Sequence, residues 1–325
     1  MFGSEAKVQT ARIAQNLKLV QPISARALVR VGMFLLGLYS IGRAQELQPR
    51  AYLPSPIGVG FGGIAYGPLA GGLLFDPSLP ITDGHVNAQI WTASAGGVFG
   101  TLGRTSQVLA ILPYVVADLT GNVAGTGASR HKSGLADSVF RYSVNLIGAP
   151  AMRRKEFASY RQKNILGISL TVQAPTGQYD PKVLINLGAN RWAFKPEVGV
   201  STAHGRWVYE GAFGVWLYSR NSKFPGGFLR TQSPLLSTQA HLVRLVRQRH
   251  WIAFDTSYFA GAIGRVDGIK KSTNQSSLRV GLTYGLIFSG RQSVRFSYFD
   301  TTLARLGGNT QSLGVAYQFL WATGR

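Results

Sequence analysis

The sequence contains no cysteine, few charged residues and no long apolar run. With no Cys among 325 residues, a disulfide framework, a thiolate metal site and a cysteine nucleophile are all excluded. Charged residues make up 14% of the chain, against about 25% in an average soluble domain. Past residue 50 no apolar run reaches the length of a transmembrane helix. The hydrophobic fraction is still 45%, so apolar residues must be finely interleaved with small and polar ones.

Acidic residues are also scarce: 13 Asp and Glu stand against 34 Lys and Arg, a net charge of +21. Such an excess indicates a nucleic-acid partner when the basic residues cluster on one face or in one run. Here they are spread over the whole length, so we expect no nucleic-acid partner. Aromatic residues make up 11% of the chain, which excludes a disordered protein.

Residues 1–44 have the pattern of a signal peptide with an extended n-region. Five Lys and Arg residues precede an apolar stretch over residues 31–42. That stretch is shorter than the roughly 20 residues a transmembrane helix needs, but it suits the hydrophobic region of a signal peptide. Small residues at Gly42 and Ala44 predict cleavage between Ala44 and Gln45. The alternative is a buried helix of a cytosolic domain.

From residue 50 onward, large apolar residues alternate with small or polar ones. In residues 313–321 every odd position is large and apolar, whereas Ser312, Gly314, Ala316 and Gln318 are small or polar. A strand puts these two sets on opposite faces. The pattern predicts twelve strands, over residues 57–67, 86–97, 105–118, 136–147, 164–175, 190–203, 206–219, 234–246, 249–260, 276–288, 292–300 and 310–321.

An even number of strands joined by both tight turns and long loops is typical of a transmembrane β-barrel. We expect long loops over residues 68–85, 120–134 and 221–234. A soluble β-sandwich also alternates, but these strands are longer than its usual 5–6 residues and match a tilted bilayer crossing. Aromatic residues near strand ends suit an interfacial girdle: Trp192, Trp207, Trp216, Tyr218, Trp251, Tyr258 and Trp321. We therefore predict an all-β fold, a transmembrane antiparallel barrel of about twelve strands over residues 45–325.

The C-terminal strand carries a second indication. Ser312-x-Gly314-x-x-Tyr317-x-Phe319 resembles the terminal-strand signal by which outer-membrane barrels are recognised for insertion. This predicts the cell outer membrane as the location, and the barrel-assembly machinery as a partner. The alternative is an ordinary last strand with aromatic packing.

Four stretches of the sequence resemble a known family, the putative MetA-pathway of phenol degradation. They cover residues 74–81, residues 133–137 leading to 143–150, residues 173–181 and residues 184–199. The likeness runs from about residue 50 to the end and is most specific in the middle third. The resemblance implies an outer-membrane barrel with a transport-related role, and it identifies no substrate.

Two motifs suggest other chemistry. Gly58 to Gly63 fits the dinucleotide pattern GxGxxG, with Asp83 in place of the ribose-binding acid, but three prolines follow where the helix and second strand belong. His131-Lys-Ser133 resembles the His-x-Ser stretch of outer-membrane phospholipase, yet it lies in a polar segment that we predict to be a loop. The other histidines lack metal-ligand spacing. We therefore expect no metal, no cofactor and no enzymatic activity.

Charged residues inside the alternating strands fall in phase with the polar set. An Arg or Lys facing lipid at mid-depth would cost about 2–4 kcal/mol, so a barrel should point these side chains into its lumen. The predicted lumen-lining residues are Asp137, Arg141, Lys195, Glu197, Glu210, His241, Asp255 and Arg279. They could line a polar path or form a plug of ion pairs, because a twelve-stranded barrel is intermediate in width.

Three functions fit these patterns. The first is a porin-like outer-membrane channel for small solutes, including aromatic or hydrophobic ones. The second is a structural or surface-interaction barrel whose basic loops bind anionic lipopolysaccharide and the outer-membrane lipid. The third is a lipid hydrolase in the barrel wall, for which His131 and Ser133 are the only candidates. We favour the channel.

Overall fold

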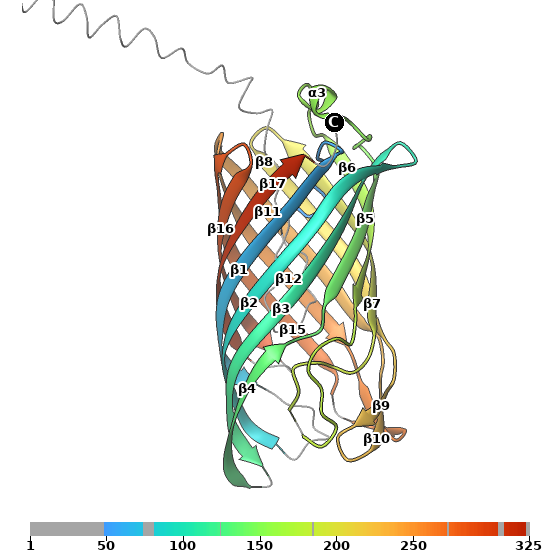
Figure 1. Ribbon diagram of the computed structural model, residues 1–325, viewed down its shortest axis with the longest axis vertical. Coiled ribbons are helices and arrows are strands. Elements are labelled where there is room, and N and C mark those ends of the chain that lie inside the picture. The colour runs from blue at the N-terminus through green and yellow to red at the C-terminus, as the bar shows by residue number, and fades with distance from the viewer. Residues whose placement is uncertain are drawn as a thin grey trace, which may run out of the picture.

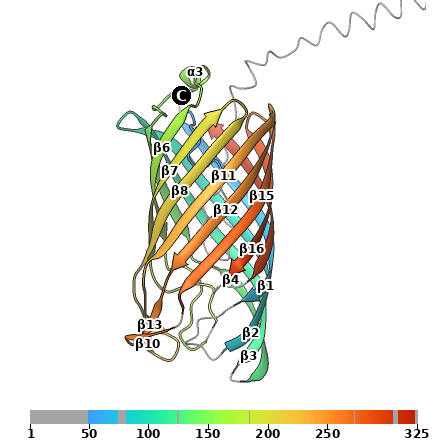
Figure 2. The ribbon, with the colours of Figure 1, turned by 180° about the vertical axis from the view of Figure 1, so that it is seen from behind.

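The computed structural model describes residues 49–73, 81–123, 125–183, 185–271, 273–304 and 309–322. Within them the chain forms a closed antiparallel barrel of twelve wall strands (Figures 1 and 2). The predicted signal peptide, residues 1–44, and its cleavage site lie outside the described residues. The predicted fold class and strand number are confirmed.

The wall is built from eleven continuous strands and one interrupted strand. The continuous strands are β1 (Val59–Leu73), β2 (Ile81–Thr101), β3 (Arg104–Val123), β6 (Asn164–Gln173), β7 (Ala193–His204), β8 (Trp207–Tyr218), β11 (Leu235–Arg247), β12 (His250–Gly261), β15 (Gln275–Ser289), β16 (Gln292–Ala304) and β17 (Thr310–Ala322). The interrupted strand consists of β4 (Thr126–Leu135) and β5 (Val139–Ile147), which both pair with β3.

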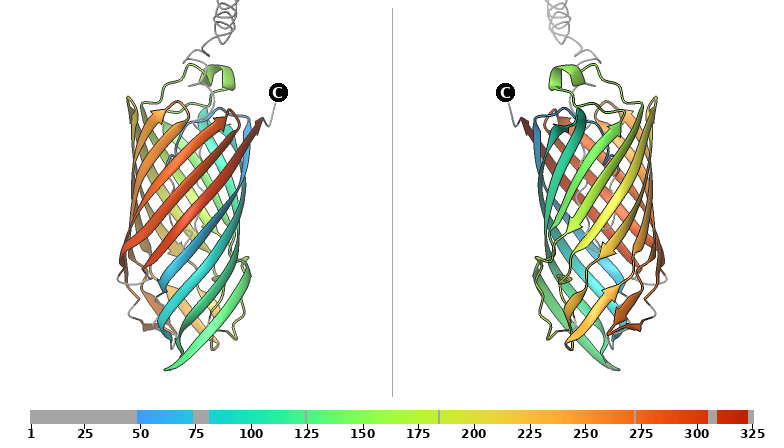
Figure 3. Two further views of the ribbon diagram at one scale, coloured as in Figure 1. Left: turned by 90° about the vertical axis from the view of Figure 1, so that its left-hand side faces the viewer. Right: turned by 90° about the vertical axis from the view of Figure 1, so that its right-hand side faces the viewer.

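Closure of the ring depends on the two ends of the wall. Strand β17 pairs with β1 from Val59 opposite Ala322 to Gly71 opposite Thr310, and the two strands lie side by side in Figure 3. The other wall strands pair with their neighbours along the chain. A closed sheet leaves no strand edge with unpaired backbone groups, which is the condition for a sheet to sit in hydrocarbon.

The predicted alternation is confirmed by burial along the strands. In β17, Ser312 and Gln318 are buried, whereas Leu313 and Phe319 are exposed. Across the wall, large apolar side chains dominate the exposed face and Ser, Thr and charged side chains recur on the buried one. This inverts the rule for a soluble domain and is the distribution expected of a barrel in lipid.

One end of the barrel, here called the short-turn end, carries two-residue turns at residues 102–103, 205–206, 248–249 and 290–291. Both Leu102 (φ 49°) and Gly103 (φ 74°) have positive φ, as a type I′ hairpin turn requires. The same end carries the β5–β6 connection with α3 (Arg154–Phe157). No helix among the described residues is long and apolar enough to cross a membrane.

The opposite, long-loop end contains more strand than we predicted. Residues 120–134, expected as a loop, form most of a β3–β4 hairpin, and β1 and β2 extend into the region 68–85. Residues 221–234 include β9 (Asn221–Phe224) and β10 (Phe228–Gln232), which join β13 (Gly264–Val266) and β14 (Ile269–Lys270) in a four-stranded sheet. The loop predictions were wrong because an exposed, polar strand such as β4 has no alternating apolar residues by which to recognise it.

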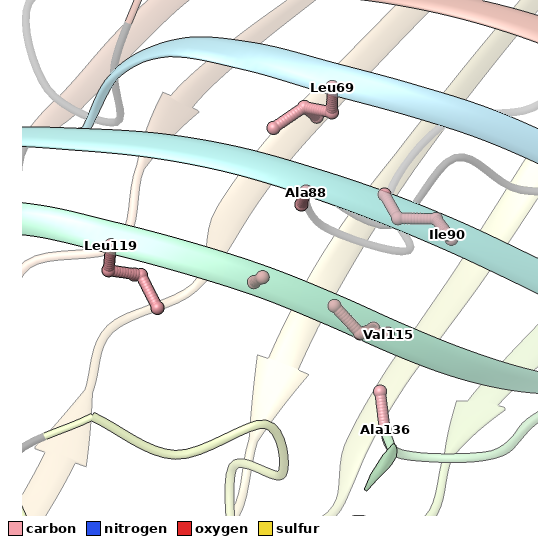
Figure 4. Packing of buried hydrophobic residues seen from close by; sticks show 7 residues of the cluster. Leu69, Ala88, Ile90, Val115, Leu119 and Ala136 are labelled. Atoms are coloured by element: carbon pink, nitrogen blue, oxygen red, sulfur yellow. The ribbon is translucent and has the colours of Figure 1, made fainter. Parts of the chain in front are cut away.

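The inner wall differs between its two halves. On β1, β2 and β3 the buried side chains are mostly aliphatic, and Figure 4 shows one such cluster with Leu69, Ile90, Val115 and Leu119. On β5 to β12 they include many polar and charged groups. The GxGxxG stretch opens β1 rather than a helix, so the nucleotide-binding interpretation is excluded.

Candidate functional site

The predicted lumen-lining residues lie on the buried side of the wall. Asp137, Arg141, Lys195, Glu197, His241 and Asp255 are buried, whereas Glu210 and Arg279 are half-buried. Seven of the eight lie on wall strands. Asp137 instead lies in the break between β4 and β5, not within a strand over residues 136–147 as we predicted.

Strand register brings three of these residues and Ser201 into one row across the wall. Ser201 on β7 lies opposite Glu210 on β8, which lies opposite His241 on β11, which lies opposite Asp255 on β12. Ser201 Oγ donates to Glu210 Oε1 at 3.1 Å. His241 Nδ1 lies 2.7 Å from Asp255 Oδ1, and both side chains are buried. The row thus holds two hydrogen-bonded pairs side by side, an arrangement that the linear spacing of these residues does not reveal.

A second charged cluster lies nearer the long-loop end. Lys195 Nζ lies 2.7 Å from Glu197 Oε2, and their side chains are 0% and 1% exposed. Lys195 Nζ also lies 5.5 Å from the ring centroid of Trp216. Trp216 and Trp251 are both buried, so our assignment of these two to an outer aromatic girdle was wrong. Both occupy inward positions in their strands, whereas Trp192, Tyr258 and Trp321 are exposed as expected.

The segment of residues 49–58, here called the N-terminal segment, lies inside the barrel although its sequence did not predict this. Arg50 and Tyr52 are 2% and 4% exposed. The Arg50 N–H donates to Glu210 Oε2 at 2.5 Å, and Asn145 Nδ2 donates to the Tyr52 carbonyl at 3.1 Å. Because Glu210 and Asn145 are inward groups of β8 and β5, the segment lies inside the barrel. Its three prolines stiffen it, but nothing in its pattern indicates burial.

The Tyr52 side chain occupies a niche in the polar half of the wall. Its hydroxyl donates to Glu197 Oε1 at 3.0 Å and lies 3.2 Å from Ser169 Oγ. The guanidinium carbon of Arg141 lies 5.0 Å from its ring centroid. Burial raises the pKa of the Tyr52 hydroxyl, so the phenol stays protonated and remains a hydrogen-bond donor.

The β6–β7 loop, residues 174–192, also folds inward, and Asp137 anchors it. Asp137 Oδ1 accepts the Gly177 N–H at 3.0 Å, and Oδ2 accepts the Ala189 N–H at 2.9 Å. Ile185 and Leu187 of the loop pack on the aliphatic cluster of β1 to β3. Three of the four family-like stretches, residues 133–137, 173–181 and 184–199, thus meet at one carboxylate. The role that these three stretches share is structural: they hold the β6–β7 loop at Asp137.

The candidate hydrolase pair lies on β4, not in the loop we predicted. His131 Nδ1 lies 2.8 Å from Asp118 Oδ1, and the side chains are 61% and 70% exposed. Within the described chain, no hydrogen bond joins His131 to Ser133. Among the described residues no group of three or more His, Asp and Glu could hold a metal ion.

The fold is similar to that of several solved structures. A crystal structure of an outer membrane channel from Pseudomonas putida F1 is 18% identical, with a TM-score of 0.73, and the match covers 85% of this chain and 100% of that one. The β domain of the Bordetella autotransporter BrkA is 12% identical, with a TM-score of 0.49, covering 80% and 99%. The NanC porin is 7% identical, with a TM-score of 0.45, covering 79% and 98%.

No curated protein matches the chain. The family comparison is more decisive, because it matches residues 80–319, which span β2 to β17 and include the Asp137 cluster and the charged inner wall. The chain belongs to the family described as "Putative MetA-pathway of phenol degradation".

Proposed function

We propose that this chain is an outer-membrane channel for small solutes, including aromatic or hydrophobic ones. The observation that carries the proposal is the placement of buried charged groups such as Arg141, Lys195 and Glu197 on the inner face of a closed barrel. A barrel with only a structural role would be more stable with well-packed apolar residues there, because buried charges are costly to desolvate. The eight predicted residues then line the solute path.

The difference between the two halves of the inner wall supports the proposed class of solute. One half, on β1 to β3, presents Leu69, Ile90 and Val115, and the other presents the polar row and the Lys195–Glu197 pair. Binding sites for small organic molecules combine an apolar surface with a few placed polar groups. This interior suits a solute with an apolar body and one polar group. The N-terminal segment and the β6–β7 loop narrow the path from opposite ends.

We infer that the chain is not an enzyme. A catalytic Ser–His pair needs hydrogen-bond contact and an environment that excludes water, whereas His131 and Asp118 are well exposed. Replacing Ser133 by Ala should leave the membrane phospholipids of overexpressing cells unchanged relative to the wild type. Phospholipid breakdown that depends on Ser133 would overturn this inference.

The barrel implies outer-membrane lipid as its surroundings, and two partners extend this proposal. Exposed Lys223, Arg265 and Lys270 on the four-stranded sheet of the long-loop end suit the phosphates of lipopolysaccharide. Strand β17, which closes the ring on β1, suits recognition by the barrel-assembly machinery.

We further propose that residues 1–44 are a cleaved signal peptide and residues 45–325 the mature barrel. N-terminal sequencing of membrane-fraction protein tests the cleavage, and a retained residue 20 would contradict it.

Conductance of the refolded chain 45–325 in planar bilayers tests the channel, with Arg141→Gln and Glu197→Gln in parallel. We expect discrete conductance steps, a shift toward cation selectivity in Arg141→Gln and a shift toward anion selectivity in Glu197→Gln, because each removes one lumen charge. Asp118→Asn, an exposed acid on the β3–β4 hairpin, is the matched control and should keep wild-type selectivity. A folded barrel with neither conductance nor solute uptake would favour the structural alternative.

A further inference from the structure

The niche around Tyr52 is assembled from wall strands, whereas its occupant comes from outside the wall. Gly167 and Ser169 lie on β6, Glu197 and Gly199 on β7, and Arg141 on β5. Tyr52 belongs to the N-terminal segment, which precedes β1. The niche therefore belongs to the barrel wall, and its occupant belongs to a separate segment.

Two glycines shape the niche to a flat ring. Gly167 and Gly199 face each other across the β6–β7 pair. A Cβ at Gly167 would lie 2.3 Å from Cδ1 of the Tyr52 ring, and a Cβ at Gly199 would lie 2.0 Å from Cε2. Neither glycine has a positive φ, so their backbone conformation does not demand glycine. Glycine is needed at both positions because a Cβ would occupy the space of the Tyr52 ring.

The polar groups of the niche match a neutral phenolic hydroxyl. Glu197 Oε1 accepts the hydroxyl at 3.0 Å, and Ser169 Oγ lies 3.2 Å from it. Glu197 is itself held by Lys195 at 2.7 Å. A carboxylate can only accept a hydrogen bond, so it favours a donor such as a neutral phenol over a phenolate or a benzoate, which has no hydrogen to donate. The Arg141 guanidinium near the ring, 5.0 Å from its centroid, adds attraction to the π face.

We propose that this niche is a binding site for neutral para-alkyl phenols, and that Tyr52 is its internal occupant, displaced by such a solute. The tyrosine side chain is itself a para-alkyl phenol, so p-cresol reproduces its ring, its hydroxyl and its Cβ. The site deepens the channel proposal, on which it rests for the route by which solute arrives. The site also specifies the class of solute that would pass the point at which the N-terminal segment narrows the channel.

Calorimetric titration of the refolded Tyr52→Gly barrel with p-cresol tests the site, because the substitution removes the atoms that p-cresol would replace. Toluene lacks the hydroxyl, and 4-methylbenzoate carries a negative charge. We expect p-cresol to bind about tenfold or more tightly than toluene, as a hydrogen bond to a charged acceptor predicts, and 4-methylbenzoate not to bind. Equal binding of p-cresol and toluene, or binding of neither, would overturn the proposal.

Two further substitutions in the Tyr52→Gly background separate shape from polarity. Glu197→Gln should remove most of the preference for p-cresol over toluene, and Gly199→Ala should abolish binding of both, because the new Cβ occupies the ring space. Gly127→Ala on β4 is the matched control, since only Asn122 Oδ1 at 3.9 Å lies near its Cβ position. Unchanged p-cresol binding in the Gly199→Ala variant would place the ligand elsewhere and overturn the assignment.

A measurement on the wild-type chain covers the case in which Tyr52→Gly does not fold. Arg50 is 2% exposed, so trypsin should cleave after it slowly. Displacement of Tyr52 by p-cresol should accelerate this cleavage several-fold, and toluene at the same concentration should not. A cleavage rate that p-cresol leaves unchanged would contradict displacement. Phenol binding without any conductance would refute the channel alone, whereas conductance without phenol binding would refute only this site.

Discussion

Two segments fold into the barrel, and they are attached in different ways. The β6–β7 loop is held through its backbone: Gly177 and Ala189 donate to Asp137, and Gln178 N–H donates to the Leu135 carbonyl at 2.9 Å. The N-terminal segment is held through its backbone too, because the Arg50 N–H donates to Glu210 and the Tyr52 carbonyl accepts from Asn145. It also inserts the Tyr52 side chain into the wall, where the hydroxyl donates to Glu197. The two anchors differ in kind: a wall carboxylate binds the backbone of the loop, whereas a niche in the wall takes up the Tyr52 side chain of the N-terminal segment. Substitution of Asp137 therefore tests the attachment of the loop, and substitution of Tyr52 tests that of the N-terminal segment.

The largest effect should come from Asp137→Ala. It removes a buried carboxylate and leaves the Gly177 and Ala189 N–H groups without their acceptor, which should cost about 3 kcal/mol or more. We expect earlier unfolding in urea and rapid trypsin cleavage after Lys182, which lies in the loop. Asp118→Ala, which removes an exposed acid, is the control. Equal trypsin sensitivity of the two variants would show that Asp137 does not hold the loop.

Tyr52→Ala should act on the other segment and leave the wall intact. Loss of the ring empties the niche over Gly167 and Gly199, so the N-terminal segment should leave its position more often. We expect a clear rise in mean single-channel conductance with resistance of the β6–β7 loop to trypsin unchanged. Faster trypsin cleavage of the β6–β7 loop in the Tyr52→Ala variant would show that the two segments are coupled, and would contradict their independent attachment.

Tyr52→Phe is a smaller change of the same kind. It deletes only the hydroxyl that donates to Glu197 at 3.0 Å, and such a hydrogen bond to a charged group contributes about 1.5–3 kcal/mol. Part of this is recovered by water at Glu197, so the conductance should fall between those of the wild type and Tyr52→Ala. Conductance equal to that of Tyr52→Ala would assign the whole effect to the hydroxyl.

The smallest effect should come from His131→Ala. The pair with Asp118 is 2.8 Å long but well exposed on the β3–β4 hairpin, and exposed pairs contribute about 0–1 kcal/mol. We expect unfolding in urea, conductance and trypsin sensitivity to match the wild type. A large change in any of them would assign the hairpin a role that the burial of its side chains does not indicate.

The sequence predicted the wall well where inward residues are small or polar. In β17 and β15 the contrast between faces is strong, as with Leu282 and Thr283. It predicted less on β2 and β3, where Ile90 and Val115 face inward and Trp91 and Tyr114 face outward. Both faces of these strands are then apolar, so apolar and polar residues no longer alternate and the strand ends are hard to locate. Trp216 and Trp251 were misplaced because composition does not give the face of a residue.

The interior was predicted only in part. Position in the alternating pattern of the strands was enough to identify Arg141, Glu197 and Asp255 as inward, because charge on the lipid face is costly. The niche of Tyr52 was not predictable, since Gly167, Gly199 and Tyr52 come from three separate segments whose contact depends on strand register and on entry of the N-terminal segment. A tyrosine among prolines has no local pattern that indicates burial.

Single-channel conductance of the refolded chain 45–325, with and without residues 45–56, tests the central claim most directly. The channel proposal predicts discrete steps for the chain 45–325 and markedly larger steps for the shortened one, because removal of Arg50 and Tyr52 widens the path beside the charged wall. A folded barrel in which neither form conducts would contradict it.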